Sequence, residues 1–255
     1  MSEIVIDIET IPDLEYGREH LNLDGLSDED IIRAMTFRFL QQTGSEFPPL
    51  NMHKIITISL LMVSSEITAI KTFSIKEQTE EQILKSLHKE LNKDASKLIS
   101  WNGLIFDIPV ILFRSMLYEL TSSELLLCSS KHLDLKNEIS FGQTDKIQGL
   151  GTVSKQVGSS GKPIDSGKMV WDMYEDKAFN EITEYCESDV INTYLVYLSH
   201  QLLNREIDIS QKQEHFDKLN ACLQEHNPNH LALICLLYTS PSPRDRTRSR
   251  MPSSA

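Results

Sequence analysis

The stretch that most restricts the fold of this chain is residues 54–63, KIITISLLMV, which is apolar and rich in β-branched side chains. Such a run predicts a buried β-strand. A short polar turn at residues 64–66, SSE, separates it from a second strand expected at residues 67–73. Two strands joined by so short a turn pair as a hairpin, so the chain is expected to build an antiparallel sheet.

Shorter strand and helix patterns surround this hairpin. Strands are expected at residues 3–8, 97–101 and 132–135, and helices at residues 28–41, 77–91, 108–120, 179–203 and 211–224. Strands therefore come first and then mix with helices along the chain. This order predicts an α/β or α+β layer fold with a partly antiparallel sheet.

Two acids follow directly on the first apolar strand, in the sequence IVIDIET. Asp7 and Glu9 are two residues apart, so in a strand both carboxylates point to the same face. Chance placement on a solvated strand edge is the simpler explanation of such a pair. However, adjacent carboxylates beside a buried strand repel one another and lose solvation, and a bound divalent cation removes both penalties. The pair is therefore a candidate metal site.

A further acid ends the segment WNGLIFD, where an expected strand runs through an Asn-Gly turn into a helix. Asp107 stands at the start of that helix. A second candidate metal ligand is one interpretation of its position. An ordinary helix N-cap is an equally good one.

The last acid lies within the helix expected at residues 179–203, in the sequence YCESD. Tyr185 and Asp189 are four residues apart and therefore share one helical face. Core helices rarely direct an acid inward without a partner. The alternative is that Asp189 lies at the edge of the apolar stripe and faces water.

These segments supply four carboxylates from a first strand, a strand-to-helix turn and a late helix. Such elements can converge at one edge of a sheet, and carboxylate oxygens are the ligands that Mg²⁺ and Mn²⁺ prefer. The chemistry that needs this arrangement is phosphoryl hydrolysis with two metal ions about 4 Å apart. The residues alone thus point to metal-dependent phosphoryl hydrolysis.

In this order, the three segments resemble the exonuclease motifs of the DEDD superfamily: DIET, WNGLIFD and YCESD. The tyrosine four residues before the last aspartate is similar to the tyrosine type of that superfamily. The flanks LDGLSDEDIIRAM, KHLDL and GSSGKPIDSGKMVWDMY extend the resemblance, over about residues 3–207, to predicted 3′–5′ exonucleases related to the proofreading domain of family B DNA polymerases. It implies a ribonuclease-H-like α/β fold: a mixed sheet, with a three-stranded antiparallel part and parallel strands, flanked by helices.

The resemblance also implies roles for individual residues. Asp7 is expected to bridge two Mg²⁺ or Mn²⁺ ions, and Asp107 to support one of them. Glu9 and Asp189 are expected to bind the ion on the side of the nucleophile. Tyr185 is expected to orient the attacking water, because a phenol with a pKa of ~10 is a poor general base at neutral pH. The expected contacts to substrate come from Thr10, Ile11, Asn102 and Phe106.

The activity that the resemblance implies is hydrolysis of phosphodiester bonds from a free 3′ end, with release of nucleoside 5′-monophosphates. Single-stranded DNA is the expected partner. The alternatives are an RNA-processing exonuclease and a non-catalytic nucleic-acid-binding module on the same fold. The formal charge of −12 argues against a passive nucleic-acid coat, which normally carries a basic surface. No run approaches the ~20 apolar residues of a membrane helix, so no membrane partner is expected.

The chain is expected to have three parts. Residues 1–207 form the exonuclease domain and residues 208–234 a C-terminal helical extension. Residues 235–255 are rich in Ser, Pro and Arg, a composition typical of disorder. We interpret this tail as non-native, with a basic nucleic-acid-binding arm as the alternative. The first strand begins too early to leave room for a signal peptide, and the four cysteines form no C-x-x-C motif, so the cytoplasm is the expected location.

Overall fold

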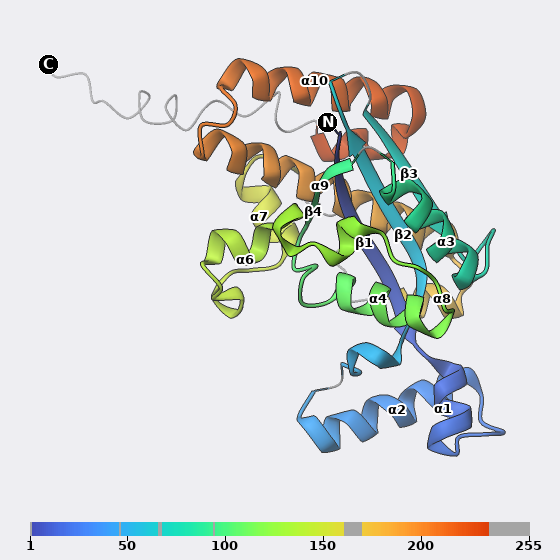
Figure 1. Ribbon diagram of the computed structural model, residues 1–255. Helices are drawn as coiled ribbons and strands as arrows, with labels where there is room; N and C mark the ends of the chain where they lie inside the picture. Colours follow the sequence, from blue (N-terminus) through green and yellow to red (C-terminus); the bar gives the residue numbers. More distant parts are fainter. Residues whose placement is uncertain (1, 46, 66–67, 94, 161–169, 235–255) are drawn as a thin grey trace, which may run out of the picture.

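A five-stranded mixed sheet forms the centre of the protein (Figure 1). The computed structural model describes residues 2–45, 47–65, 68–93, 95–160 and 170–234. The strands, in the spatial order β3-β2-β1-β4-β5, are β1 (Ser2–Pro12), β2 (His53–Val63), β3 (Thr68–Ser74), β4 (Ala95–Ser100) and β5 (His132–Asp134). Strands β3, β2 and β1 are antiparallel neighbours, whereas β1, β4 and β5 run parallel. The mixed sheet expected from the sequence is confirmed.

Helices cover both faces of this sheet (Figure 1). They are α1 (Leu14–Leu21), α2 (Asp28–Thr43), α3 (Glu80–Leu91), α4 (Asp107–Leu117), α5 (Glu124–Leu127), α6 (Leu135–Ser140), α7 (Leu150–Gln156), α8 (Val170–Glu175), α9 (Phe179–Leu203) and α10 (Ile209–His226). Short 3₁₀ turns occur at Leu50–Met52, Ser129–Lys131, Thr144–Lys146 and Pro228–His230. None of the helices in the described part of the chain is long and apolar enough to cross a membrane.

Alternation along β1 assigns its side chains to two separate cores. Ile4, Ile6 and Ile8 pack with apolar residues of α3, α4 and α5 on one face. Val5 packs with apolar residues of α7, α9 and α10 on the other. Because side chains two apart in a strand share a face, Asp7 and Glu9 continue the row begun by Val5. Both acids therefore face α9.

Strand β1 is longer than the sequence predicts. We expected it at residues 3–8, with the acids at its end, but it continues to Pro12, so both acids lie inside the strand. Its pairing with β4 stops at Val5, while its pairing with β2 continues as far as Pro12 opposite His53. Pairing with β2 therefore extends β1 beyond the two carboxylates, where the sequence predicted its end.

The first helix was not expected from the sequence. Asp13 caps α1 by accepting a hydrogen bond from the Tyr16 backbone N–H at 3.2 Å. Only Leu14 and Gly17 of this eight-residue helix are buried, so the segment has no apolar period that could predict it. By contrast, α9 begins and ends at the residues expected, Phe179 and Leu203, and Ser27 caps α2 as expected.

The C-terminal part of the described chain packs against the sheet and α9. Helix α10 contributes Phe216, Leu219 and Leu223 to the core that also contains Val5. Beyond it, residues to 234 remain in contact with this core through Leu233 and Ile234. Residues 235–255, interpreted above as a non-native tail, lie outside the described residues.

Candidate active site

A row of polar side chains crosses the sheet face beneath α9. Asp7 stands opposite Ser59 of β2, Glu9 stands opposite Thr57, and Ser59 in turn stands opposite Thr72 of β3. The hydroxyl oxygens of Ser59 and Thr72 are 3.0 Å apart. The hydroxyl side chains of Thr57, Ser59 and Thr72 thus lie next to the two acids, on a sheet face that is otherwise apolar.

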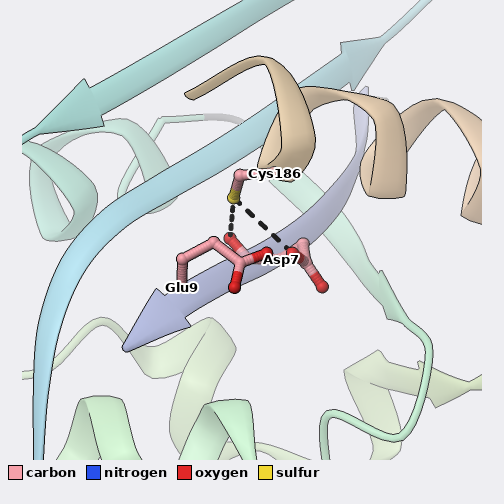
Figure 2. A group of neighbouring side chains, drawn as sticks. All are labelled: Asp7, Glu9 and Cys186. Atoms are coloured by element: carbon pink, nitrogen blue, oxygen red, sulfur yellow. Dashed lines mark hydrogen bonds between the residues drawn. The ribbon is translucent and has the colours of Figure 1, made fainter. Parts of the chain in front are cut away.

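Cys186 of α9 closes over the acids of β1 (Figure 2). Its Sγ lies 3.4 Å from the Asp7 carbonyl oxygen and 3.5 Å from Asp7 Oδ2, and donates to both. One ligand atom each from Asp7, Glu9 and Cys186 lies within 4.8 Å of the others. Burial, and then the charges of Asp7 and Glu9, raise the pKa of the Cys186 thiol, so it is neutral at pH 7.

Asp107 also contacts strand β1, although it lies far from β1 in the sequence. It is the first residue of α4, and its Oδ1 accepts a hydrogen bond from the Ile8 backbone N–H at 3.2 Å. Ile8 stands between Asp7 and Glu9. The N-cap interpretation of Asp107 is wrong, because Phe106 occupies the cap position and α4 has no side-chain cap. Instead, Asp107 binds β1 where β4 no longer pairs with it.

Electrostatics place the last acid in the same cluster. Burial, and then the charges of Asp134 and Asp189, raise the pKa of Asp107 to about 7, against hydrogen bonds from the Asp107 and Ile8 backbone N–H groups. Asp189 also raises the pKa of Cys186. The water-facing alternative for Asp189 is wrong, because this side chain is only 6% exposed. The described structure thus brings the four expected acids into one neighbourhood.

Tyr185 lies one helical turn before Asp189 on α9 and is buried as well. Glu187, the other acid of the YCESD segment, has a different environment. Its Oε1 accepts a hydrogen bond from Thr72 Oγ1 at 2.7 Å, and its Oε2 lies 2.8 Å from His230 Nε2. Glu187 therefore connects α9 to β3 and to the C-terminal segment.

Asp134 holds the loop that leads to Asp107. At the end of β5, its carboxylate accepts hydrogen bonds from the backbone N–H groups of Asn102 and Leu104, at 2.9 and 3.1 Å. Asn102 has a left-handed backbone with φ of 68°, which asparagine tolerates better than most residues. Gly103 passes so close to Ser100 that a Cβ would lie 2.3 Å from Ser100 Oγ. This tight turn fixes where α4 begins.

Two of the residues expected to contact substrate, Thr10 and Phe106, both contact His53. Thr10 Oγ1 lies 2.9 Å from His53 Nδ1, and the His53 ring packs edge-on against Phe106. Asn102 is half-buried in the loop between β4 and α4. Ile11 is only 1% exposed and packs with Ile56, Met173 and Ile182, so its placement does not support a side-chain contact to substrate.

A comparison with protein families matches residues 45–234 to a family described as predicted 3′–5′ exonucleases related to the exonuclease domain of PolB. The chain belongs to this family. The membership expected from the sequence is confirmed. The matched range includes Asp107, Tyr185 and Asp189, whereas Asp7 and Glu9 precede it. No curated protein sequence matches the chain.

Two solved structures are similar to this member of the PolB-related family. The family B DNA polymerase from the hyperthermophilic archaeon Pyrobaculum calidifontis matches with a TM-score of 0.53 and 13% identity, over 91% of this chain and 27% of that chain. E. coli exonuclease I in complex with a 5cy-dT13 oligonucleotide matches with a TM-score of 0.39 and 10% identity, over 86% of this chain and 43% of that chain. The chain thus spans less than half of either protein. The likeness to the polymerase confirms the expected ribonuclease-H-like fold.

Several residues of the site in this PolB-related protein were not expected from the sequence. Cys186 and Glu187 belong to the YCESD segment, but the sequence pattern indicated no role for them. Thr57 and Ser59 could have been recognised from the sequence, because they interrupt the apolar run of residues 54–63 and are two positions apart. Polar residues with this spacing share one face of a strand, which is the face of Asp7 and Glu9.

Proposed function

We propose that this protein is a metal-dependent 3′–5′ exonuclease that hydrolyses phosphodiester bonds from the 3′ end of DNA. The observation that carries the proposal is the hydrogen bond from the Ile8 N–H to Asp107, which joins the WNGLIFD segment to the strand between Asp7 and Glu9. Asp189 joins the same neighbourhood from α9 through its effect on the pKa of Asp107. Membership in the PolB-related exonuclease family supports the same reaction class.

The donor set fits two hard divalent cations, Mg²⁺ or Mn²⁺. Carboxylate oxygens are their preferred ligands, and several buried carboxylates in one place are costly without a compensating charge. When bound, such ions polarise the scissile phosphate and lower the pKa of a bound water. By analogy with the motif pattern, Asp7 would contact both ions, Glu9 and Asp189 the ion nearer the nucleophile, and Asp107 the other.

The protein's own groups then do three things. Burial raises the pKa of Asp107 to about 7, so a bound cation would favour its ionised, ligating form. Tyr185 would donate a hydrogen bond that orients the attacking water, because a phenol with an ordinary pKa of ~10 is a poor general base at pH 7. Asp189 and Tyr185 are buried residues of α9, which restricts the movement of both side chains.

Single-stranded DNA is the substrate that we propose. With a formal charge of −12, the protein cannot attract a phosphate backbone by net charge, which favours binding of a strand end at the metal site over long tracking. All four acids and Tyr185 are present, which disfavours a non-catalytic binding module. Three cysteines of the described residues are free, in keeping with the reducing cytoplasm as the expected compartment.

A side-by-side assay tests the proposal. Purified protein is incubated in Mg²⁺, in Mn²⁺ or in EDTA with 5′-labelled and 3′-labelled DNA single strands, with duplex DNA and with RNA. The 5′-labelled single strand should shorten in one-nucleotide steps, and the 3′ label should appear at once as a mononucleotide, both only with metal. Preference for RNA would identify an RNA-processing enzyme. Binding of all polymers without hydrolysis would identify a non-catalytic module.

A further inference from the structure

We propose that His230 is a positioning residue for the candidate active site, which it supports by holding Glu187 of α9. The inference rests on the proposed function and adds to it a residue outside the three motifs that carry the acids. His230 ends the short 3₁₀ turn Pro228–His230, which follows α10. Its burial, its carboxylate partner and the polar contacts beyond that partner carry the proposal.

His230 and Glu187 form a buried pair. His230 is 4% exposed and Glu187 is 9% exposed. The Nε2 atom of His230 lies 2.8 Å from Glu187 Oε2, and because a carboxylate only accepts, Nε2 carries the proton and donates. Asn227 Nδ2 reaches the same oxygen at 3.4 Å. A buried carboxylate is costly without donors, so the segment after α10 supplies the donors that Glu187 needs on this side.

The other carboxylate oxygen of Glu187 connects the pair to the sheet. Thr72 Oγ1 of β3 donates to Glu187 Oε1 at 2.7 Å, and the same hydroxyl oxygen lies 3.0 Å from Ser59 Oγ of β2. Ser59 stands opposite Asp7 in the sheet, and its side chain is hydrogen-bonded to the Cys186 thiol. The contacts of Glu187 thus continue, through two hydroxyl groups, to the strand pair that holds Asp7.

Two neighbouring residues of α9 therefore attach this helix to different strands. Cys186 contacts Asp7 of β1, and Glu187 contacts β3, with β2 between these strands. Consecutive residues of an α-helix point about 100° apart, so the two attachments restrict rotation of α9 about its axis. Tyr185 and Asp189 lie within two residues of Glu187. A rotation would move both relative to Asp7, so a donor that holds Glu187 also helps to fix the distances between the proposed ligands.

The segment that carries His230 has a second attachment. Leu233 packs in a core with residues of α9 and α10, and its carbonyl oxygen accepts a hydrogen bond from the Ser160 N–H at 3.0 Å. Ser159 Oγ lies 3.2 Å from the same carbonyl oxygen and 2.6 Å from Asn192 Oδ1 of α9. Because these contacts do not involve His230, a change of that side chain should leave the segment folded in place.

Asn229, the residue before His230, offers a matched comparison. Its Nδ2 donates to Glu184 Oε1 of α9 at 2.9 Å, and both residues are exposed. This pair joins the same segment to the same helix, but at the surface, where water can replace either partner. Asn229→Ala should therefore leave the candidate site unchanged.

The test measures Mn²⁺ binding, read as loss of the electron paramagnetic resonance signal of the free ion, and then single-turnover hydrolysis of a 5′-labelled DNA strand. His230→Leu removes the donor and keeps most of the buried volume, whereas His230→Gln keeps an N–H donor. Thr72→Val removes the hydroxyl on the other side of Glu187. Asp7→Asn measures how much Mn²⁺ binds elsewhere on this acidic protein.

A positioning role predicts that His230→Leu weakens Mn²⁺ binding about 10-fold and lowers kcat by a similar factor. Thr72→Val should weaken Mn²⁺ binding as well, while His230→Gln and Asn229→Ala should retain most of the wild-type affinity. A merely structural bond would instead lower the thermal unfolding midpoint of His230→Leu and leave the Mn²⁺ affinity of the folded protein unchanged. That result overturns the inference, as does an equal loss in His230→Gln. If His230→Leu fails to fold, wild-type Mn²⁺ affinity in Thr72→Val overturns it.

The two levels of the account fail in different ways. If the wild type releases no mononucleotides in Mg²⁺ or Mn²⁺, the proposed function is wrong, whatever the variants show. If it releases them and a folded His230→Leu binds Mn²⁺ as tightly as the wild type, the exonuclease proposal stands and the positioning role of His230 is wrong.

Discussion

The carboxylate of Asp107 is bound to the backbone N–H of Ile8, ninety-nine positions earlier in the chain, at 3.2 Å. Strand β4 leaves this N–H without a strand partner, because its pairing with β1 ends at Val5. One bond therefore fastens the start of α4 to the strand that carries Asp7 and Glu9. The relative placement of three candidate ligands depends on this contact.

Asp107 should make stability depend on pH in the metal-free protein. Its folded pKa of about 7 lies above the ordinary value of 3.8, so between about pH 4 and pH 7 the unfolded chain ionises while the folded one keeps its proton. Its contribution to the free energy of unfolding should fall across this window, by at most about 4 kcal/mol. Urea unfolding in EDTA at pH 5 and pH 8 should show a smaller difference for Asp107→Asn than for wild type; equal differences contradict the assignment.

The turn before α4 should tolerate no side chain at Gly103. A Cβ there would lie 2.3 Å from Ser100 Oγ and 2.6 Å from Ser100 Cβ, and Ser100 is itself fully buried and bonded to His132. Gly103→Ala should therefore displace Asp107, destabilise the protein by about 1–3 kcal/mol and reduce hydrolysis. Gly149→Ala is the matched control, since its Cβ would meet no atom within 4 Å. If both variants behave alike, the close packing is not real.

A buried ionic network should hold α4 in place. Arg114 donates to Glu80 of α3 and to Asp13 after β1, and its side chain is 3% exposed. Arg114→Met leaves two buried carboxylates without their cation, and should cost about 3–5 kcal/mol in the free energy of unfolding. The exposed pair of Arg33 and Glu29 is the control, and Arg33→Met should cost less than about 1 kcal/mol. Similar losses in chemical denaturation would refute this role.

Tyr185 and Asp7 should differ in how much they contribute to turnover. If the phenol only orients the attacking water, Tyr185→Phe removes one hydrogen bond and lowers kcat by about 10-fold. In the proposed two-ion site, Asp7→Asn would remove a ligand of both ions and should lower kcat by about 100-fold or more. Single-turnover hydrolysis of a 5′-labelled strand in Mg²⁺ compares them. Equal losses would show that Tyr185 takes a larger part in the chemistry.

The sequence predicted the sheet and the long helix α9 well because their signals are local. The apolar run of residues 54–63 and the helical period of residues 179–203 each lie within one element. The role of Asp107 was undecided between cap and ligand for the opposite reason. Its partner is a backbone N–H on a strand near the other end of the sequence, which no local pattern reveals.

The contacts of Ile11 and Cys186 show the same limit. Ile11 follows the acids in sequence and was expected to line the cleft, yet the strand continues and Ile11 turns into a core with Met173 and Ile182. In the sequence, Cys186 resembles any buried residue of a core helix. Its thiol contacts Asp7 only because α9 packs on β1. Long-range packing decides both placements, and it appears only in the folded chain.

The measurement that tests the account most directly is hydrolysis of a 5′-labelled DNA single strand in Mg²⁺ by Asp7→Asn, Asp189→Asn and Glu181→Gln. Glu181 is an exposed acid on the same helix as Asp189 and serves as the control. Because both site variants relieve repulsion among buried carboxylates, their thermal unfolding midpoints should not fall. The account predicts stepwise shortening from the 3′ end by wild type and Glu181→Gln, and a loss of about 100-fold or more in both site variants. Wild-type turnover in clean preparations of either site variant would contradict it.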